Sequence, residues 1–244
     1  MKRNNNVFQI YLSDKEGDIP PLIALATESI KSNLNGYDYH IFRGEELRNL
    51  IKVEFDKETL KSYDKLLPYA YKADLARYCL LYKFGGWYFD ISVTMNSQIP
   101  RVDGVRNVIF KDAPNPGLSS WNCSNSVLFS VAGDSIYEKI ISEINKNCSE
   151  KYYGTNSLCP TGPSLLGQIF AAHGPQNTTI TGMLLPLTPH HPIKNYAFVL
   201  PDGNIFAWGK KTWGTNIGDG LSGLGAEGTN SYSQLYALRK IYAE

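Results

Sequence analysis

Long apolar runs and any marked excess of one charge are absent from this sequence. Its 244 residues contain no apolar stretch near the roughly 20 residues that a membrane-spanning helix needs. The formal net charge is only +1, so no broad basic surface for nucleic acid and no acidic tail is expected. These absences predict a protein with no transmembrane helix and no nucleic-acid partner.

Cysteine is sparse as well, and the sequence motifs of several enzyme classes are missing. The 4 cysteines lack the spacing of a metal site, which favours reduced thiols. No Ser/His/Asp grouping, phosphate-binding P-loop or dinucleotide fingerprint is present. The first residues are basic and polar with no apolar stretch behind them, which argues against a secretory leader. We expect a cytoplasmic protein, and peripheral association with the inner face of the cytoplasmic membrane stays open.

The apolar residues that are present alternate between strand-like and helix-like patterns. Strands are predicted at 7–12 and 37–42, with helices at 20–33 and 69–84 and a charged, helix-prone segment at 44–67. This β-α-β-α order favours a parallel sheet with helices on its faces. The fold class expected is therefore α/β.

The second half of the chain changes character. After a strand at 107–111, a strand at 127–131 and a helix at 135–147, the sequence from 179 to 208 is rich in short strands separated by proline and Asp-Gly turns. Such strands predict an antiparallel addition to the first half and no separate domain. A final helix is expected at 231–242, beyond a glycine-rich stretch that has the length of either a lid or a connector.

A helix followed by a pair of glycines is the most informative part of the sequence. Residues 69–84 are apolar nearly all round, as in a buried helix, yet Asp74 and Arg77 lie three positions apart on one face. Two charges inside such a helix need partners. Gly85 and Gly86 then end the helix, because glycine adopts a left-handed cap at no steric cost.

A short strand with two polar positions follows the glycines. Residues 87–93 are aromatic or β-branched apart from Asp90 and Ser92, which is the composition of a buried strand. Side chains alternate along a strand, so Asp90 and Ser92 are expected to point the same way. A carboxylate and a hydroxyl that leave the end of a buried strand together suit a cation, a sugar or a diphosphate.

This segment resembles the sugar-binding region of family 32 glycosyltransferases. The resemblance rests on the run Ala73-Asp74-x-x-Arg77 … Leu81-Tyr82-x-x-Gly85-Gly86-x-Tyr88-x-Asp90-x-Ser92. Members of that family are retaining enzymes of the GT-A fold, among them glucosyltransferase domains of clostridial toxins and bacterial enzymes that build capsule and lipopolysaccharide. The resemblance implies a GT-A-like, Rossmann-type mixed sheet with helices on both faces. It also implies one domain over 1–244, with a nucleotide-sugar-binding half at 1–110 and an acceptor-side half at 111–244.

Three residues of the run are the catalytic candidates that the resemblance implies. The family's counterpart of Asp74 holds hydroxyls of the donor sugar, and the counterpart of Arg77 lies beside the sugar and the diphosphate. Arginine suits this place because its planar fork binds phosphate in a bidentate way. The counterpart of Asp90 binds the donor and reaches a metal ion. From the residues alone, Asp74 and Arg77 could equally form a simple intrahelical ion pair.

A divalent cation, Mn²⁺ or Mg²⁺, is the cofactor that the resemblance implies. Asp90 would supply a carboxylate oxygen, which these hard cations prefer. In the family a second aspartate follows two positions later, and here that position is Ser92. A neutral hydroxyl predicts weaker metal binding than two carboxylates, and Lys210 or Lys211 could then neutralise part of the diphosphate charge.

Further donor-binding positions follow from looser matches to the family. Tyr11 matches an aromatic residue that lies against the uracil, although a packed strand tyrosine is the plain alternative. The Thr-Gly-Pro at 161–163 matches another family element, although proline is also simply a good helix start. The full set of donor-binding candidates is Tyr11, Tyr88, Ser92, Thr161, Gly162, Lys210, Lys211 and Trp213.

The expected activity is transfer of a sugar from a nucleotide donor, a UDP-sugar, to a carbohydrate or lipid-linked glycan acceptor with retention at the anomeric carbon. The family's bacterial members place this reaction in the synthesis of capsule or lipopolysaccharide. Two alternatives stay open. One is a toxin-like enzyme that glycosylates a protein, and the other is a non-catalytic module that binds sugar nucleotides, which Ser92 would suit.

Overall fold

One mixed sheet runs through the protein, whose computed structural model describes residues 1–15, 17–95, 97–113, 119–187, 196–209 and 220–244. The strands in these ranges are β1 (Asn6–Ile10), β2 (Asp38–Phe42), β3 (Gly86–Phe89), β4 (Asn107–Asp112), β5 (Cys123–Ser130), β6 (Thr179–Pro186), β7 (Tyr196–Val199) and β8 (Ile205–Gly209). They lie in the order β2-β1-β3-β5-β4-β6-β7-β8.

The directions of the strands bring several chain segments to one edge of the sheet. β1 pairs in parallel with β2 and β3, and β4 pairs in parallel with β6. β5 runs against both β3 and β4. The carboxyl ends of β3 and β4 therefore lie at the same edge as the amino end of β5, and this edge is where ligands bind in open α/β sheets.

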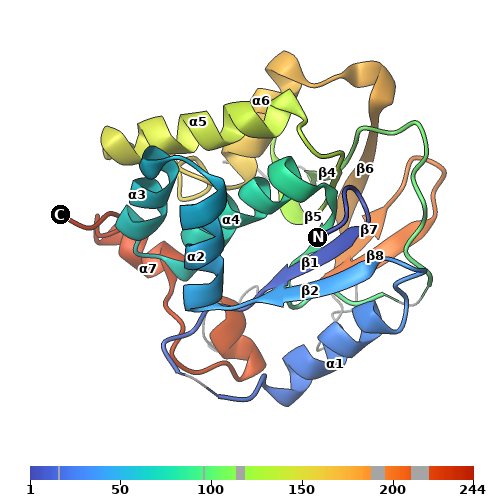
Figure 1. Cartoon of the computed structure of the whole chain (residues 1–244), viewed down its shortest axis with the longest axis horizontal. Helices are drawn as coiled ribbons and strands as arrows, with labels where there is room; N and C mark the ends of the chain where they lie inside the picture. The colour runs from blue at the N-terminus through green and yellow to red at the C-terminus, as the bar shows by residue number, and fades with distance from the viewer. Residues whose placement is uncertain (16, 96, 114–118, 188–195, 210–219) are drawn as a thin grey trace.

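Helices cover both faces of the sheet, which confirms the predicted α/β class (Figure 1). α1 (Pro21–Lys31) lies on one face, and its Ile30 packs with strand residues of that side. The other face carries α2 (Gly44–Glu54), α3 (Lys57–Lys65), α4 (Tyr69–Phe84), α5 (Ser135–Ser149) and α6 (Pro163–His173), and the chain ends beyond α7 (Tyr232–Ala237). None of the helices in the described ranges is long and apolar enough to cross a membrane.

α4 is the helix around which the larger core is built. It contacts β1, β3 and β5 on the sheet side and α2, α3, α5 and α7 elsewhere. Residues on all sides of it are buried, including Leu75, Tyr78 and Leu81. Contact on every side explains why its sequence lacks an amphipathic stripe. The predicted helix 69–84 is confirmed, and its two charges are indeed inside the core.

Gly86 combines a positive φ with close contact to a neighbouring strand, so its replacement should disturb the fold. Its φ is +115°, and a Cβ there would lie 2.2 Å from the carbonyl oxygen of Asn6 on β1. Gly86→Ala is expected to lower the free energy of unfolding by about 2–4 kcal/mol, through backbone strain and the clash together. Gly203→Ala is the matched control, because Gly203 has φ +85° but open space around it. Urea unfolding that gives both variants the same loss would contradict the role of the clash.

The structure differs from the sequence-based expectation in the length of several elements. The predicted strand 87–93 was wrong beyond Phe89, because Val93 N donates to Asp90 O at 2.9 Å and closes a turn. Asp90 and Ser92 therefore do not alternate along a strand. The predicted strand 127–131 is longer at its start, since β5 already begins at Cys123.

Two helical segments also differ from the sequence-based expectation. The helix-prone stretch 44–67 forms two helices, because the Asp56 side chain accepts a hydrogen bond from Thr59 N at 2.8 Å and starts α3 anew. The final helix is short: α7 ends at Ala237, where the prediction ran to 242. The residues beyond it form a turn at Leu238 and Arg239, and Tyr242 then bridges to Leu66.

Candidate functional site

Five polar residues from four segments converge at the carboxyl edge of the sheet. Asp74 and Arg77 come from α4, and Asp90 is the first residue after β3. Asn125 lies on β5, and Thr161 lies two residues before α6. All but Asp90 are buried. We call this set the polar cluster.

Arg77 is the centre of the polar cluster. Its Nη2 lies 3.1 Å from Asp74 Oδ1, and its Nη1 lies 3.0 Å from Asp90 Oδ1. Nη1 also donates to the backbone oxygen of Asn125 at 2.6 Å. The guanidinium stacks over the ring of Tyr88, 4.6 Å from its centroid. A planar fork with several donors can bridge two carboxylates in this way, whereas an ammonium group cannot.

Asp74 is held by hydrogen bonds on both of its oxygens. Asn125 Nδ2 donates to Oδ1 at 2.8 Å, and Thr161 Oγ1 donates to Oδ2 at 2.7 Å. Burial raises the pKa of Asp74 to about 6, against the opposing effects of the Arg77 charge and the Thr161 hydrogen bond. The side chain is thus fixed in one orientation and ionises within reach of neutral pH.

This pKa predicts how kcat/KM should depend on pH. If ionised Asp74 accepts a hydroxyl of the substrate, kcat/KM should fall about tenfold per unit as the pH drops below about 6, because the protonated carboxyl becomes dominant there in the free protein. The measurement is kcat/KM between pH 4.5 and 8, with the pH profile of Asp74→Asn as the control. If the residual activity of Asp74→Asn fell at low pH in the same way as that of the wild type, another group would be responsible for the decrease.

Asp90 presents its carboxylate at the surface of the polar cluster. Its side chain is 31% exposed, and Oδ1 accepts the hydroxyl of Tyr88 at 2.8 Å as well as the contact from Arg77. Its backbone is fixed by β5, since Asp90 N donates to Ser126 O at 2.7 Å. Among the described residues nothing contacts Oδ2 within hydrogen-bond distance. One carboxylate oxygen is therefore free to take a ligand.

The side chains around Asp90 bear on the divalent cation that the sequence predicts. Asp90, Ser92 and Ser126 offer oxygen atoms to a small cavity of about 40 Å³, whose other walls include the apolar side chains of Leu184 and Phe198. Within the described ranges, no group of three or more His, Cys, Asp or Glu side chains converges on one point. Magnesium is usually held by one or two carboxylates together with substrate phosphates and water. The residues thus fit a cation that binds together with a diphosphate, with Asp90 and Ser92 as the protein ligands.

Asn125 is the site residue that sequence reasoning missed. The register between β4 and β5 shifts here, since Val108 pairs with Phe129 whereas Phe110 pairs with Ser124. More residues of β5 than of β4 span this irregularity. The carbonyl of Asn125 accepts a hydrogen bond from Arg77 there. In the sequence, the polar residues that directly precede the buried apolar residues 127–129 could have indicated a site residue here.

Three of the predicted donor-binding residues are buried behind the surface of the site. Tyr88 is 1% exposed, and its hydroxyl donates to the partly exposed Asp90. Thr161 is fully buried against Asp74, and a Cβ on Gly162 would lie 3.4 Å from Asp74 Oδ2. These residues hold the polar cluster in place, so their predicted contact with the donor would act through Asp74 and Asp90.

Tyr11, the predicted base-stacking residue, is also buried. It follows β1, and its ring packs with Ile91 and with Leu224 of the short 3₁₀ helix η2 (Gly220–Leu224). The Arg43 guanidinium lies 5.6 Å from the ring centroid. A nucleobase could stack on Tyr11 only after η2 or Arg43 moved aside.

The remaining predicted positions fall near the C-terminal end. Lys210, Lys211 and Trp213 lie outside the described residues. Of the glycine-rich stretch 214–228, the part from Gly220 onwards is described, and it is tied to the end of β1: Asp14 N donates to Gly228 O at 2.8 Å. This stretch is therefore anchored next to Tyr11 at its C-terminal end.

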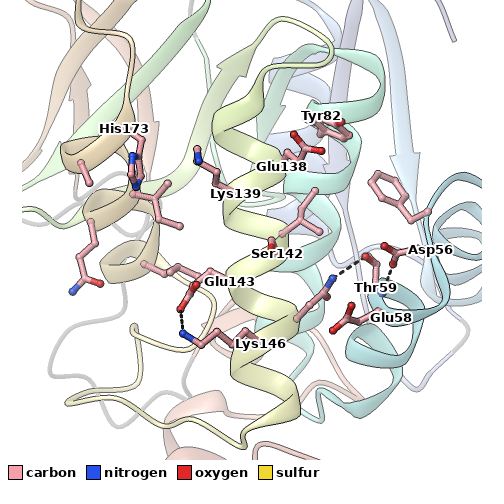
Figure 2. Close-up of a pocket in the computed structure, with 17 residues that line it drawn as sticks. Asp56, Glu58, Thr59, Tyr82, Glu138, Lys139, Ser142, Glu143, Lys146 and His173 are labelled. Atoms are coloured by element: carbon pink, nitrogen blue, oxygen red, sulfur yellow. Dashed lines mark hydrogen bonds and ion pairs between the residues drawn. The ribbon is translucent and has the colours of Figure 1, made fainter.

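A larger hollow lies elsewhere and contains no predicted site residue. It has a volume of about 880 Å³ and flanks α5, between α3 on one side and α6 on the other (Figure 2). Its walls carry acidic and basic side chains, including the pair Lys146 and Glu143 at 3.6 Å. Mixed charges on an exposed helix are typical of a solvated surface.

Comparison with known proteins assigns the chain to an enzyme class. The profile of the family described as "Glycosyltransferase sugar-binding region containing DXD motif" matches residues 20–114, which contain α4, β3 and Asp90. The match covers less than half of the chain, and over these residues the chain is similar to that family. The protein is a glycosyltransferase, as the sequence predicted.

Individual proteins are also similar to this chain. A protein of Acanthamoeba polyphaga mimivirus named "Uncharacterized glycosyltransferase L373" is 26% identical over 192 residues, covering 79% of this chain and 74% of the relative. Among solved structures, the PaToxG glycosyltransferase superposes with a TM-score of 0.52 at 16% identity, covering 71% of this chain and 70% of the other, which supports the GT-A-like fold. A glycosyltransferase involved in the glycosylation of the major capsid of PBCV-1 matches at 12% identity and a TM-score of 0.39, over 72% and 80% of the two chains.

Proposed function

We propose that this glycosyltransferase moves a sugar from a UDP-sugar donor to a glycan acceptor of the surface-polysaccharide kind, with retention at the anomeric carbon. The observation that carries the proposal is the polar cluster, in which a buried arginine joins two carboxylates at the ligand-binding edge of the sheet. This cluster lies within the segment that the glycosyltransferase family matches, apart from its supports on β5 and before α6.

Each group of the polar cluster has a role in this reaction. Asp74, fixed by Asn125 and Thr161, accepts a hydroxyl of the donor sugar and orients the ring. Arg77 faces the departing diphosphate and stabilises the negative charge that develops on it. Asp90 and Ser92 would hold the divalent cation, which would supply further charge neutralisation on the diphosphate.

Donor turnover and product analysis test the proposal together. Purified protein is incubated with UDP-glucose, UDP-galactose and UDP-N-acetylglucosamine, with and without Mn²⁺, and UDP release is measured. We expect slow hydrolysis of at least one donor and an increase of the rate with Mn²⁺. ¹H NMR of the sugar first formed should show the anomeric configuration of the donor. Binding without any hydrolysis or transfer would favour a non-catalytic module, and an inverted product would contradict retention.

A further inference from the structure

An exposed tryptophan lies beside the polar cluster. Trp121 is 53% exposed, although tryptophan is usually buried, and it stands two residues before β5 at the carboxyl edge of the sheet. The same strand carries Asn125 four residues later. The exposed indole and the buried cluster are thus parts of one continuous segment.

The backbone of Trp121 is firmly held although its side chain is exposed. Its carbonyl oxygen lies against α6, where a Cβ on Gly167 would come within 1.7 Å of it. On the other side, Asp112 N at the end of β4 donates to Asn122 O at 2.9 Å. An aromatic side chain on a fixed backbone loses little conformational entropy when it binds a ligand.

Lys111 beside Trp121, and Met183 on the next strand beyond Lys111, give this surface both polar and apolar character. Lys111 Nζ lies 5.9 Å from the centroid of the indole. Lys111 pairs with Met183 in the register of β4 and β6, and the Met183 side chain is 42% exposed. A flat aromatic face, a thioether and an ammonium group suit a pyranose ring, which has apolar C–H faces and a rim of hydroxyl groups.

The lengths of two chain segments indicate how far Trp121 lies from the polar cluster. Along β5, the four residues from Trp121 to Asn125 span at most about 13 Å at the rise of an extended chain. Along α6, the five residues from Gly162, beside Asp74, to Gly167, beside Trp121, span about 7.5 Å. A separation on the order of 10 Å places the indole beyond the donor sugar but within reach of a short glycan.

We propose that Trp121, with Lys111 and Met183, forms an acceptor subsite that binds a pyranose ring of the glycan to be extended. The inference rests on the proposed function and adds the place where the acceptor is recognised. The indole stacks on the C–H face of the sugar, and Lys111 donates hydrogen bonds to its hydroxyl groups. The polar cluster binds the donor at the other end of the same edge.

The experiment compares wild-type protein, Trp121→Ala and Tyr152→Ala. Tyr152 is the matched control, because it is an exposed aromatic residue (44%) on the loop after α5. The C-terminal end of α5 points away from β4 and β6 (Figure 1). The probes are methyl α- and β-glycosides of glucose, galactose, mannose and N-acetylglucosamine, observed by saturation-transfer difference NMR. Hydrolysis of the UDP-sugars is measured in parallel as a readout of the donor site.

We expect ring C–H signals for at least one glycoside with wild type and Tyr152→Ala, and about a tenfold loss of affinity with Trp121→Ala, the scale of aromatic stacking. Donor hydrolysis and the melting temperature should be equal in all three proteins. Absence of signals with the whole panel, or signals that Trp121→Ala retains, would overturn the subsite while hydrolysis still supports the transferase. If none of the three proteins hydrolysed any UDP-sugar while the glycoside signals were present, the proposed function would instead be overturned.

Discussion

Asp74→Asn should lower kcat by about 100-fold or more while leaving the melting temperature at pH 7 unchanged or higher. The loss of activity follows from the proposed role of Asp74, which Asn125 and Thr161 fix in one orientation, as the acceptor for a hydroxyl of the donor sugar. An amide keeps one acceptor oxygen but no charge, and Arg77 keeps its second carboxylate, Asp90. The fold therefore retains most of its contacts.

The pKa of Asp74 gives the sign of the stability effect. Burial raises this pKa to about 6 from the ordinary 3.8, so the folded state binds the proton more tightly than the unfolded state. The contribution of Asp74 to stability is full below about pH 4 and is lost as the pH rises through about 6. At pH 7 the wild-type protein carries this penalty, and asparagine does not. The stability of Asp74→Asn relative to wild type should thus increase from pH 4 to 7, measured by thermal unfolding.

Asp134→Asn provides the matched comparison. Asp134 is equally buried, but it caps α5 through Ile136 N and contacts Arg106 and Asn107 far from the polar cluster. Its replacement should destabilise the fold by about 1–3 kcal/mol and leave kcat of the remaining folded protein unchanged. If Asp74→Asn were destabilised as much as Asp134→Asn and its activity decreased only in proportion to that destabilisation, Asp74 would be a structural ion-pair partner only.

Arg77→Lys should impair both the fold and the reaction. Lysine cannot contact Asp74, Asp90 and the Asn125 carbonyl at once, so at least one buried acceptor loses its partner. Breaking part of a buried, paired network costs about 3–5 kcal/mol when a partner is left uncompensated. We expect about 2–4 kcal/mol for this charge-conserving change, and a loss of kcat of about 100-fold.

Arg48→Lys is the control for the chemistry of the substitution. Arg48 also forms a bidentate pair, with both oxygens of Asp64 at 2.7 Å, but the pair is partly exposed on α2 and α3. Its replacement should change the free energy of unfolding by less than about 1 kcal/mol. Urea unfolding and UDP release are measured for both variants. Equal, small effects of the two changes would contradict a central role for Arg77.

The local pattern of the sequence was sufficient to predict the helix at the centre of the fold. Apolar residues on every side of α4 indicated burial, and two charges inside such a helix required partners, which the structure supplies. The glycine pair marked the reversal into β3 because both residues have positive φ. The convergence of Asp74, Arg77 and Asp90 could be predicted because the three lie close together in the sequence.

The other parts of the site depend on contacts that are distant in the sequence. Asn125 reaches Asp74 only because the β4–β5 register shifts at that point, and register is set by the whole sheet. The turn after Asp90 forms because β5 fixes its backbone from across the sheet. Tyr11 is covered by η2, a segment more than two hundred residues away in sequence. Periodicity along the chain contains no information about such pairings.

The central claim is that the donor binds at the polar cluster, and calorimetric titration of a UDP-sugar tests it most directly. The donor that the wild-type protein hydrolyses is titrated into wild type and Asp90→Asn in the presence of Mn²⁺. Because Asp90 is partly exposed and lines the small cavity together with Ser92, the variant should fold normally and bind at least about tenfold more weakly. Equal affinity of the two proteins would contradict the claim.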